Sequence, residues 1–228
     1  MKREEMEAAL QQEIDTTVVA EKRYEFYIAQ IISYTLAYNE HMVSQLINQS
    51  FEQNGVLETY KFVLYPLLVR VGLLWRKNSV CPSQEHFLSA IIRQKLYAAI
   101  DRCVVPAVKS SWLLFLPEDE DHDIGLLLAS YLLRSAGHGV SFLGAKVPFD
   151  ALRNTIQSIH PEKLLFFMTR IRPVADAQVY IDQLASSFDG TQIFVSGNPK
   201  LLTDVVFPDR CLWLKDVREL ENIATGGK

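Results

Sequence analysis

The residues with the clearest chemical potential form one short loop, Glu120-Asp121-His122-Asp123-Ile124-Gly125. A neutral imidazole is a good ligand for a transition metal, and a carboxylate two residues away can orient its other ring nitrogen. A glycine three residues after His122 lets the backbone pass close to a large ligand. Alternatively, His122 is a solvated residue at a helix start, with Asp121 or Asp123 as the N-cap.

This loop stands between an apolar strand and an amphipathic helix. An unbroken apolar run over residues 112–116 stops at Pro117, and apolar side chains recur at helical steps from residue 124. Glycines at 137 and 139 can end the helix, and a second short apolar segment follows at 140–143. Such a β-α-β unit is typical of a parallel sheet, in which ligands bind beyond the carboxyl ends of the strands. The sequence therefore places residues 118–125 at the expected binding edge.

The rest of the C-terminal half continues the alternation of strands and helices. Buried strands are predicted at 162–168, 192–195 and 211–214, and helices at 148–156, at 174–187 and near the C-terminus. We therefore expect a five-stranded, parallel, doubly wound domain of the flavodoxin-like, Rossmann type over residues 108–228.

The N-terminal half has the pattern of a helical bundle. Apolar residues recur at three- and four-residue steps over residues 21–105, the Asn54-Gly55 pair interrupts them, and Pro82 can occupy the first turn of the last helix. Four amphipathic helices of this size predict a four-helix bundle. Residues 1–20 are polar and rich in glutamate, and form either a leading helix or a linker from a preceding domain.

A second group of residues suited to a ligand lies between the last two bundle helices. Trp75 is followed by nine residues and then by Glu85-His86. Taken alone, these are a bundle residue at a helix end and two first-turn residues favoured by the helix dipole. Together with the Glu-x-His-x-x-Gly loop, about 35 residues further on, they resemble the cobalamin-binding sensor region of MerR-type transcriptional regulators, the CarH/LitR group of photoreceptors.

The resemblance implies a cobalamin, most often adenosylcobalamin, bound between the bundle, which caps it, and the α/β domain. The histidine of the loop would replace the cofactor's own base as the lower cobalt ligand, while the tryptophan would cap the upper face. Thr169-Arg170-Ile171 is similar to the family's Ser-x-Leu motif, whose hydroxyl faces the nucleotide tail, and Ser196-Gly197 would leave room for that tail between sheet and helix. The implied cofactor-binding residues are Trp75, Glu85, His86, Glu120, His122, Asp123, Gly125, Thr169, Ile171, Ser196 and Gly197, with His122 as the metal ligand and no catalytic residue.

The sequence departs from the family at several positions. In the light sensors a histidine that captures cobalt after photolysis follows the capping tryptophan, whereas here Arg76 follows it and cannot ligate cobalt. Thr169 replaces the serine and keeps its hydroxyl. Arg170 and Arg172 are unusual beside this motif, and would either contact phosphate or crowd the nucleotide tail.

Composition excludes several other classes of protein. The 228 residues are 49% hydrophobic and 22% charged with a net charge of −4, which suits globular domains without a broad basic surface for nucleic acid. No apolar segment reaches the length of a membrane span, and no signal peptide is evident, so we expect a cytoplasmic protein. Cys81, Cys103 and Cys211 are expected to be buried or half-buried thiols. We expect a homo-oligomer that reaches DNA only through a helix-turn-helix domain absent from this sequence.

Three functions remain open at this level. The first is a non-enzymatic cobalamin sensor of a transcriptional regulator. The second is a corrinoid shuttle protein of a methyltransferase, although a methyl carrier must expose the upper face of cobalt, and Trp75 would cover it. The third is a related sensor that binds haem or no cofactor, since His122 would also serve iron. Methylcobalamin is an alternative upper-ligand form.

Overall fold

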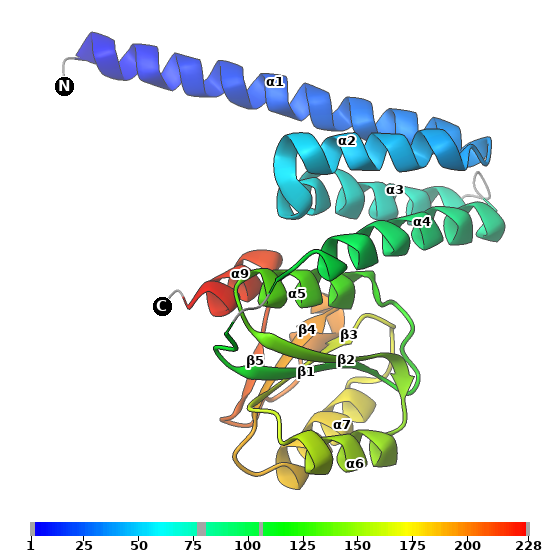
Figure 1. Cartoon of the computed structure of the whole chain (residues 1–228), viewed down its shortest axis with the longest axis vertical. Coiled ribbons are helices and arrows are strands. Elements are labelled where there is room, and N and C mark those ends of the chain that lie inside the picture. Colours follow the sequence, from blue (N-terminus) through cyan, green and yellow to red (C-terminus); the bar gives the residue numbers. More distant parts are fainter. Residues whose placement is uncertain (1–2, 77–80, 105–106, 227–228) are drawn as a thin grey trace. The chain divides into compact units, whose positions relative to one another are not determined.

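The computed structural model describes residues 3–76, 81–104 and 107–226, and the chain divides into two compact units, Met1–Lys95 and Leu96–Lys228 (Figure 1). The first unit is entirely helical in its described part. Its elements are α1 (Arg3–Leu36), α2 (Glu40–Thr59), the π-helix η1 (Tyr60–Leu64), α3 (Tyr65–Arg76) and α4 (Pro82–Asp101), the last of which continues into the second unit. The described part of the leading segment is thus helical and continuous with the first bundle helix.

The bundle core is apolar and spans all the helices of the unit. Fully buried side chains are Ile28, Ile31, Val43, Ile47, Val63, Leu64, Leu67, Leu88 and Ile92. The interruption predicted at Asn54-Gly55 is present inside α2, where Gly55 has a φ of 79°. A buried hydrogen bond of 2.9 Å between the hydroxyls of Ser50 and Thr59 joins the two sides of this kink. Glycine is suited to the position because it adopts positive φ without steric cost.

The second unit contains the predicted parallel sheet. Its strands are β1 (Ser111–Pro117), β2 (Gly139–Val147), β3 (Lys163–Met168), β4 (Gln192–Gly197) and β5 (Cys211–Trp213). They lie in the order β2-β1-β3-β4-β5, and every neighbouring pair is parallel. The helices are α5 (Ile124–Ser135), α6 (Phe149–Ile159), α7 (Val174–Ser187), the short α8 (Pro199–Leu202), which the sequence pattern did not indicate, and α9 (Val217–Thr225).

Helices cover both faces of this sheet, as a strand that is apolar along its whole length requires. In Figure 1, α5 and α9 lie on one side and α6 and α7 on the other. The α6–α7 side contains a large core in which the rings of Phe115 and Phe166 stack with centroids 5.5 Å apart. On the α5 side, the ring of Trp112 lies 5.0 Å from that of Phe194.

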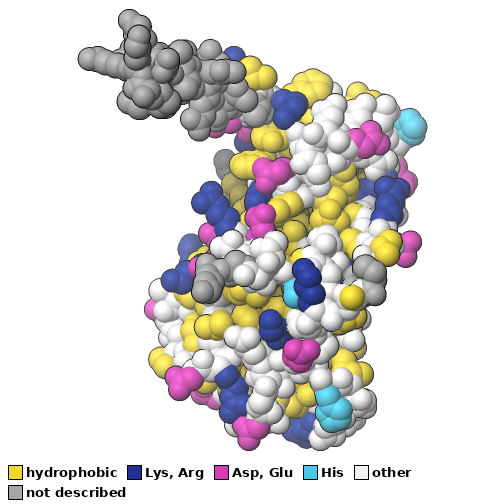
Figure 2. Space-filling view, turned by 60° about the vertical axis from the view of Figure 1, so that its left-hand side comes forward, with side chains coloured by type: hydrophobic (Ala, Val, Ile, Leu, Met, Phe, Trp, Pro, Cys, Tyr) yellow, Lys and Arg dark blue, Asp and Glu magenta, His cyan; other side chains and the backbone are white. Residues whose placement is uncertain are grey.

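Composition predicted a surface without a broad basic region, and buried or half-buried thiols. On the face seen in Figure 2, Lys and Arg side chains are interspersed with Asp and Glu. Cys103 is half-buried and Cys211 buried as expected, but Cys81, which directly precedes α4, is exposed. Among the described residues, no helix is both long enough and apolar enough to cross a membrane.

Strands β3 and β4 approach each other very closely at their carboxyl ends. Gly197 has a φ of 138°, and a methyl group at this position would lie 2.1 Å from the carbonyl oxygen of Met168. The next residue, Asn198, donates its backbone N–H to the same oxygen at 2.8 Å. Gly197 therefore serves the packing of one backbone against another in this structure.

We predict that Gly197→Ala destabilises the protein by about 2–6 kcal/mol, because backbone strain and a steric clash each cost about 1–3 kcal/mol. The matched control is Gly190→Ala, where φ is 84° but nothing lies within 4 Å of the added methyl group. That variant should lose only about 1 kcal/mol through strain. Urea denaturation of both variants measures the difference, and equal losses would show that the contact with Met168 is not limiting.

Candidate functional site

The loop that joins β1 to α5 is held at the carboxyl edge of the sheet by its own backbone and by β2. The N–H of Glu120 donates to the carbonyl of Pro117 at 2.9 Å, and the N–H of Lys146 donates to the carbonyl of Glu120 at 3.1 Å. Lys146 lies within an irregular part of the β1–β2 register and has a φ of 56°. This irregularity brings the end of β2 to the loop. The loop thus lies at the carboxyl edge of the sheet, as predicted.

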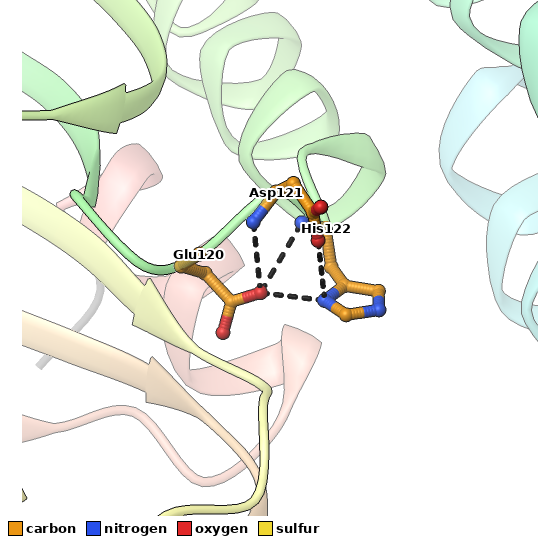
Figure 3. Close-up of side chains that lie close together, drawn as sticks. All are labelled: Glu120, Asp121 and His122. Carbon is orange, nitrogen blue, oxygen red and sulfur yellow. Dashed lines mark hydrogen bonds and ion pairs between the residues drawn. The ribbon is translucent and has the colours of Figure 1, made fainter.

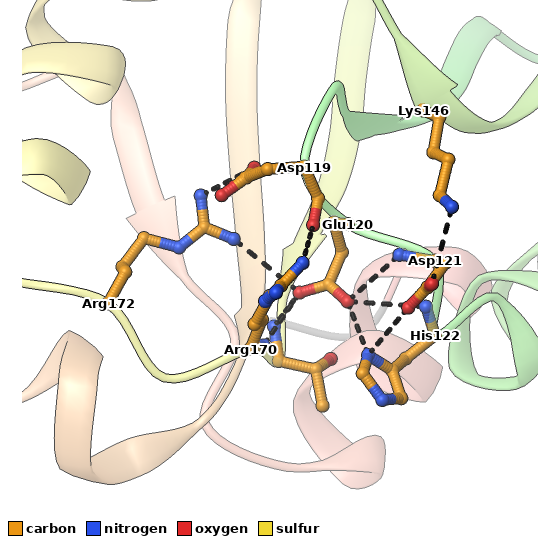
Figure 4. Close-up of polar contacts among 8 residues, drawn as sticks. Asp119, Glu120, Asp121, His122, Lys146, Arg170 and Arg172 are labelled. Carbon is orange, nitrogen blue, oxygen red and sulfur yellow. Dashed lines mark hydrogen bonds and ion pairs between the residues drawn. The ribbon is translucent and has the colours of Figure 1, made fainter.

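The carboxylate of Glu120 is completely buried and is the centre of the site (Figure 4). Its Oε2 accepts the backbone N–H groups of Thr169 and Arg170, each at 2.7 Å, from the loop after β3. Its Oε1 accepts the backbone N–H groups of Asp121 and His122 at 3.1 and 3.2 Å and contacts the imidazole of His122. One side chain therefore joins two loops that are 50 residues apart in sequence.

These donors determine the charge of the buried group. Burial by itself would raise the pKa of Glu120, but the hydrogen bonds from His122 and from the backbone of Arg170, His122 and Thr169 outweigh it and lower that pKa to about 2. Glu120 is therefore a carboxylate at neutral pH, and it acts as an acceptor for the histidine.

His122 is oriented by this carboxylate while its side chain stays 60% exposed. Its Nδ1 lies 2.5 Å from Oε1 of Glu120 and 3.4 Å from Oδ1 of Asp121. The contact with an ionised acceptor favours the tautomer with hydrogen on Nδ1, which leaves the lone pair on Nε2. Figure 3 shows the second ring nitrogen on the side away from Glu120.

The same three residues are the group of possible metal ligands in the described part of the chain. Ligand atoms of Glu120, Asp121 and His122 lie within 4.8 Å of one another. Because both oxygens of Glu120 already accept N–H groups, the carboxylate is suited to orienting a ligand rather than to being one. The donor set therefore fits a metal that takes one imidazole nitrogen from the protein.

Two arginines reinforce the contact between the loops. Nη1 of Arg172 lies 2.9 Å from Oδ1 of Asp119, and its Nη2 lies 3.6 Å from Oε2 of Glu120. Nη1 of Arg170 donates to the carbonyl of Asp119 at 3.2 Å. Figure 4 shows both guanidinium groups directed toward the acidic loop, and Lys146 beside Asp121. The sequence singled out both arginines but not these partners, which only the folded chain brings close.

The other predicted site residues of the α/β unit differ in the groups that make their contacts and in their exposure. Thr169 contributes its backbone N–H to Glu120, while the Ile171 side chain is 86% exposed. Asp123 is the half-buried N-cap residue of α5 and makes no side-chain capping hydrogen bond. Ser196 donates its hydroxyl to the carbonyl of Leu214 at 2.9 Å.

The predicted residues of the helical unit lie on its surface rather than in its core. Trp75 is 50% exposed in the last turn of α3. Glu85 and His86 open α4 with their side chains 37% and 78% exposed, and Nδ1 of His86 lies 3.2 Å from Oε2 of Glu85. The side chain of Arg76 and residues 77–80 of the motif lie outside the described residues.

The chain is similar to several known proteins. Residues 27–100 match the family model of the B12 binding domain. Over 168 residues, the chain is 27% identical to the HTH-type transcriptional repressor CarH of Myxococcus xanthus, with 73% of this chain and 56% of the repressor aligned. It is 31% identical over 122 residues to CarA, a repressor of the same organism, with 53% and 41% aligned. The chain is a relative of these repressors.

These findings confirm the resemblance read from the two motifs. The chain spans about half the length of the curated relatives it matches. Among solved structures, the monomethylamine corrinoid protein of Methanosarcina barkeri aligns with a TM-score of 0.61 at 16% identity, over 86% of this chain and 95% of that protein. That likeness confirms the predicted fold class of a helical region followed by a five-stranded parallel sheet.

The buried carboxylate predicts how stability depends on pH. A carboxyl group whose pKa is lower in the folded than in the unfolded chain stabilises the fold above its ordinary pKa of 4.5, and this contribution is lost as the pH falls toward about 2. We therefore expect Glu120→Gln to cost about 3 kcal/mol at pH 7, with a smaller difference from the unchanged protein at pH 3.

Urea denaturation at several pH values between 7 and 3 measures this difference. Glu118→Gln is the matched control, because Glu118 belongs to the same loop but is exposed. It should have little effect at any pH in this range. A loss for Glu120→Gln that stays constant from pH 7 to pH 3 would contradict the assigned role of the carboxylate.

Proposed function

We propose that this chain is a non-enzymatic cobalamin sensor module of a transcriptional regulator, with His122 as the lower cobalt ligand and adenosylcobalamin as the cofactor. The observation that carries the proposal is the pair formed by His122 and the buried Glu120 at the carboxyl edge of a parallel sheet. Ligands of such sheets bind at this edge. The match of residues 27–100 to the B12 binding domain supports the choice of cofactor.

The residues of the loop prepare one imidazole for coordination. Bound cobalamin would supply a cobalt centre that accepts a nitrogen ligand. Glu120 accepts hydrogen from Nδ1, holds the ring in one orientation and increases the basicity of Nε2. Since Thr169 and Arg170 fix the carboxylate through their backbones, the ring orientation depends on the fold rather than on a mobile side chain.

The helical unit would supply the upper side of the site. We propose that Trp75 caps the upper face of the cofactor, with Glu85 and His86 near its adenosyl group. Their exposure leaves these side chains available to a ligand, since none of the three is committed to the bundle core. Such a cap favours a sensor over a corrinoid shuttle protein, whose cobalt must accept and release a methyl group from above.

We expect the His122→Ala variant to bind hydroxocobalamin at least about tenfold more weakly, because it loses the only nitrogen ligand proposed from the protein. The cofactor retained by this variant should keep its own base on cobalt, which absorption spectra report. His160→Ala removes another exposed histidine of the same unit and should bind normally. Equal affinities and identical spectra for all three proteins would exclude His122 as the ligand.

We expect Trp75→Ala to weaken the binding of adenosylcobalamin more than that of hydroxocobalamin, since only the former presents a large upper group to the indole. Titration in the dark with each cobalamin gives the two ratios. Tyr65→Ala is the control, because Tyr65 is a similarly exposed aromatic residue of α3, at 57%. A loss of the same size for both cobalamins would remove Trp75 from the proposed cap.

The alternatives predict different spectra of the purified protein. Haem gives an intense Soret band that cobalamins lack, and a protein that binds neither pigment would be a cofactor-free relative. The upper ligand, adenosyl or methyl, follows from extraction and chromatography of the bound cofactor. We further propose that the module assembles with copies of itself, and that any contact with DNA is made by a helix-turn-helix domain outside this sequence.

A further inference from the structure

An aromatic ring lies directly beneath the first turn of α5. A methyl group at Gly125 would lie 2.9 Å from Cε1 and 3.3 Å from Cδ1 of Phe167, so the ring is packed against the glycine itself. Phe167 lies between Phe166 and Met168 in β3. Those two residues belong to the core on the α6–α7 face of the sheet, whereas Phe167 does not. Its half-buried side chain therefore lies on the α5 face of the sheet, against a glycine that is three residues from His122.

The neighbouring small residues do not open another passage there. Ser196 is the register partner of Phe167 on β4, and its hydroxyl already donates to the carbonyl of Leu214. Gly197 is in contact with the backbone of Met168. Ser196 and Gly197, which were expected to leave room between sheet and helix, are thus each engaged by the protein itself.

This packing conflicts with one requirement of the proposed function. If His122 takes the lower position on cobalt, the base of cobalamin is displaced together with its nucleotide tail, and this bulky group must be accommodated beside the histidine. One route for the tail would run between β3 and the first turn of α5, where the ring of Phe167 packs against Gly125. A tail on this route could not share the volume with the ring, because protein interiors are close-packed.

We propose that Phe167 is a specificity-determining residue that selects corrinoids by their lower nucleotide tail. A corrinoid without the tail, such as cobinamide, binds at His122 with the ring in place, whereas complete cobalamin binds in this mode only when the ring has moved to another rotamer. This inference rests on the proposed function and specifies its ligand class. The half-buried position of Phe167 allows such a movement, unlike that of the fully buried Phe166.

The test compares two ligands on matched variants of the whole chain. Dissociation constants for diaquacobinamide and hydroxocobalamin are measured by absorbance titration of the unchanged protein, of Phe167→Ala and of Phe149→Ala. Phe149 is a half-buried ring that packs on the opposite face of the sheet, so its removal reports general loosening of the domain. Phe167→Leu provides a milder change if the alanine variant folds poorly.

We expect Phe167→Ala to bind hydroxocobalamin about tenfold more tightly, as relief from overpacking of this kind allows, and to bind cobinamide as the unchanged protein does. Phe167→Leu should give a smaller shift in the same direction, and Phe149→Ala should not change the ratio of the two constants. The spectrum of bound hydroxocobalamin should show the displaced base in a larger fraction of the Phe167→Ala protein.

Two other results have distinct meanings. If the unchanged protein binds both corrinoids through His122 and Phe167→Ala changes both constants equally or neither, the role of Phe167 is wrong and the proposed function stands. If neither corrinoid binds the unchanged protein or any variant, the proposed function fails and the inference fails with it.

Discussion

The structure of the site depends on one buried charge. A carboxylate removed from water is costly unless hydrogen-bond donors surround it, and Glu120 meets this requirement with backbone N–H groups from two loops and the imidazole of His122. The constraint acts in both directions. The charge is tolerated because the loops are in place, and the loops are held in place because removing the charge would leave several backbone donors without this acceptor. The orientation of His122 is a consequence of this balance.

The surrounding residues reinforce the same edge of the sheet. Arg172 pairs with Asp119 and lies near Glu120, so the loop after β3 is held by side chains as well as by its backbone. Asn198 donates to the carbonyl of Met168, which joins the end of β4 to the same region. A ligand at this edge therefore meets a preorganised surface. The loops lose little further conformational entropy when the ligand binds.

Much of this fold could be predicted because its signals are local. The apolar run before Pro117, the helical pattern after Ile124 and the glycine at 137 mark the β-α-β unit without reference to other parts of the chain. The details that decide the site are not local. A continuously apolar strand hides which face each residue occupies, so nothing in the sequence indicated that Phe167 would pack against Gly125. In the same way, the sequence predicted a role for the hydroxyl of Thr169, whereas the structure shows its backbone N–H donating to Glu120.

His122 and the contact between Phe167 and Gly125 lie close together at the start of α5. His122 and Gly125 are three residues apart at the start of α5, and the ring of Phe167 is packed against the glycine. Free energies of neighbouring groups are not additive when they share a contact. Under the proposed coordination, a corrinoid that displaces the ring would lose part of the free energy that it gains at His122, and its measured affinity would report both contributions. Under the proposed coordination, a corrinoid that leaves the ring in place would report the binding at His122, and the change in the ratio of the two constants on Phe167→Ala would report the contribution of Phe167.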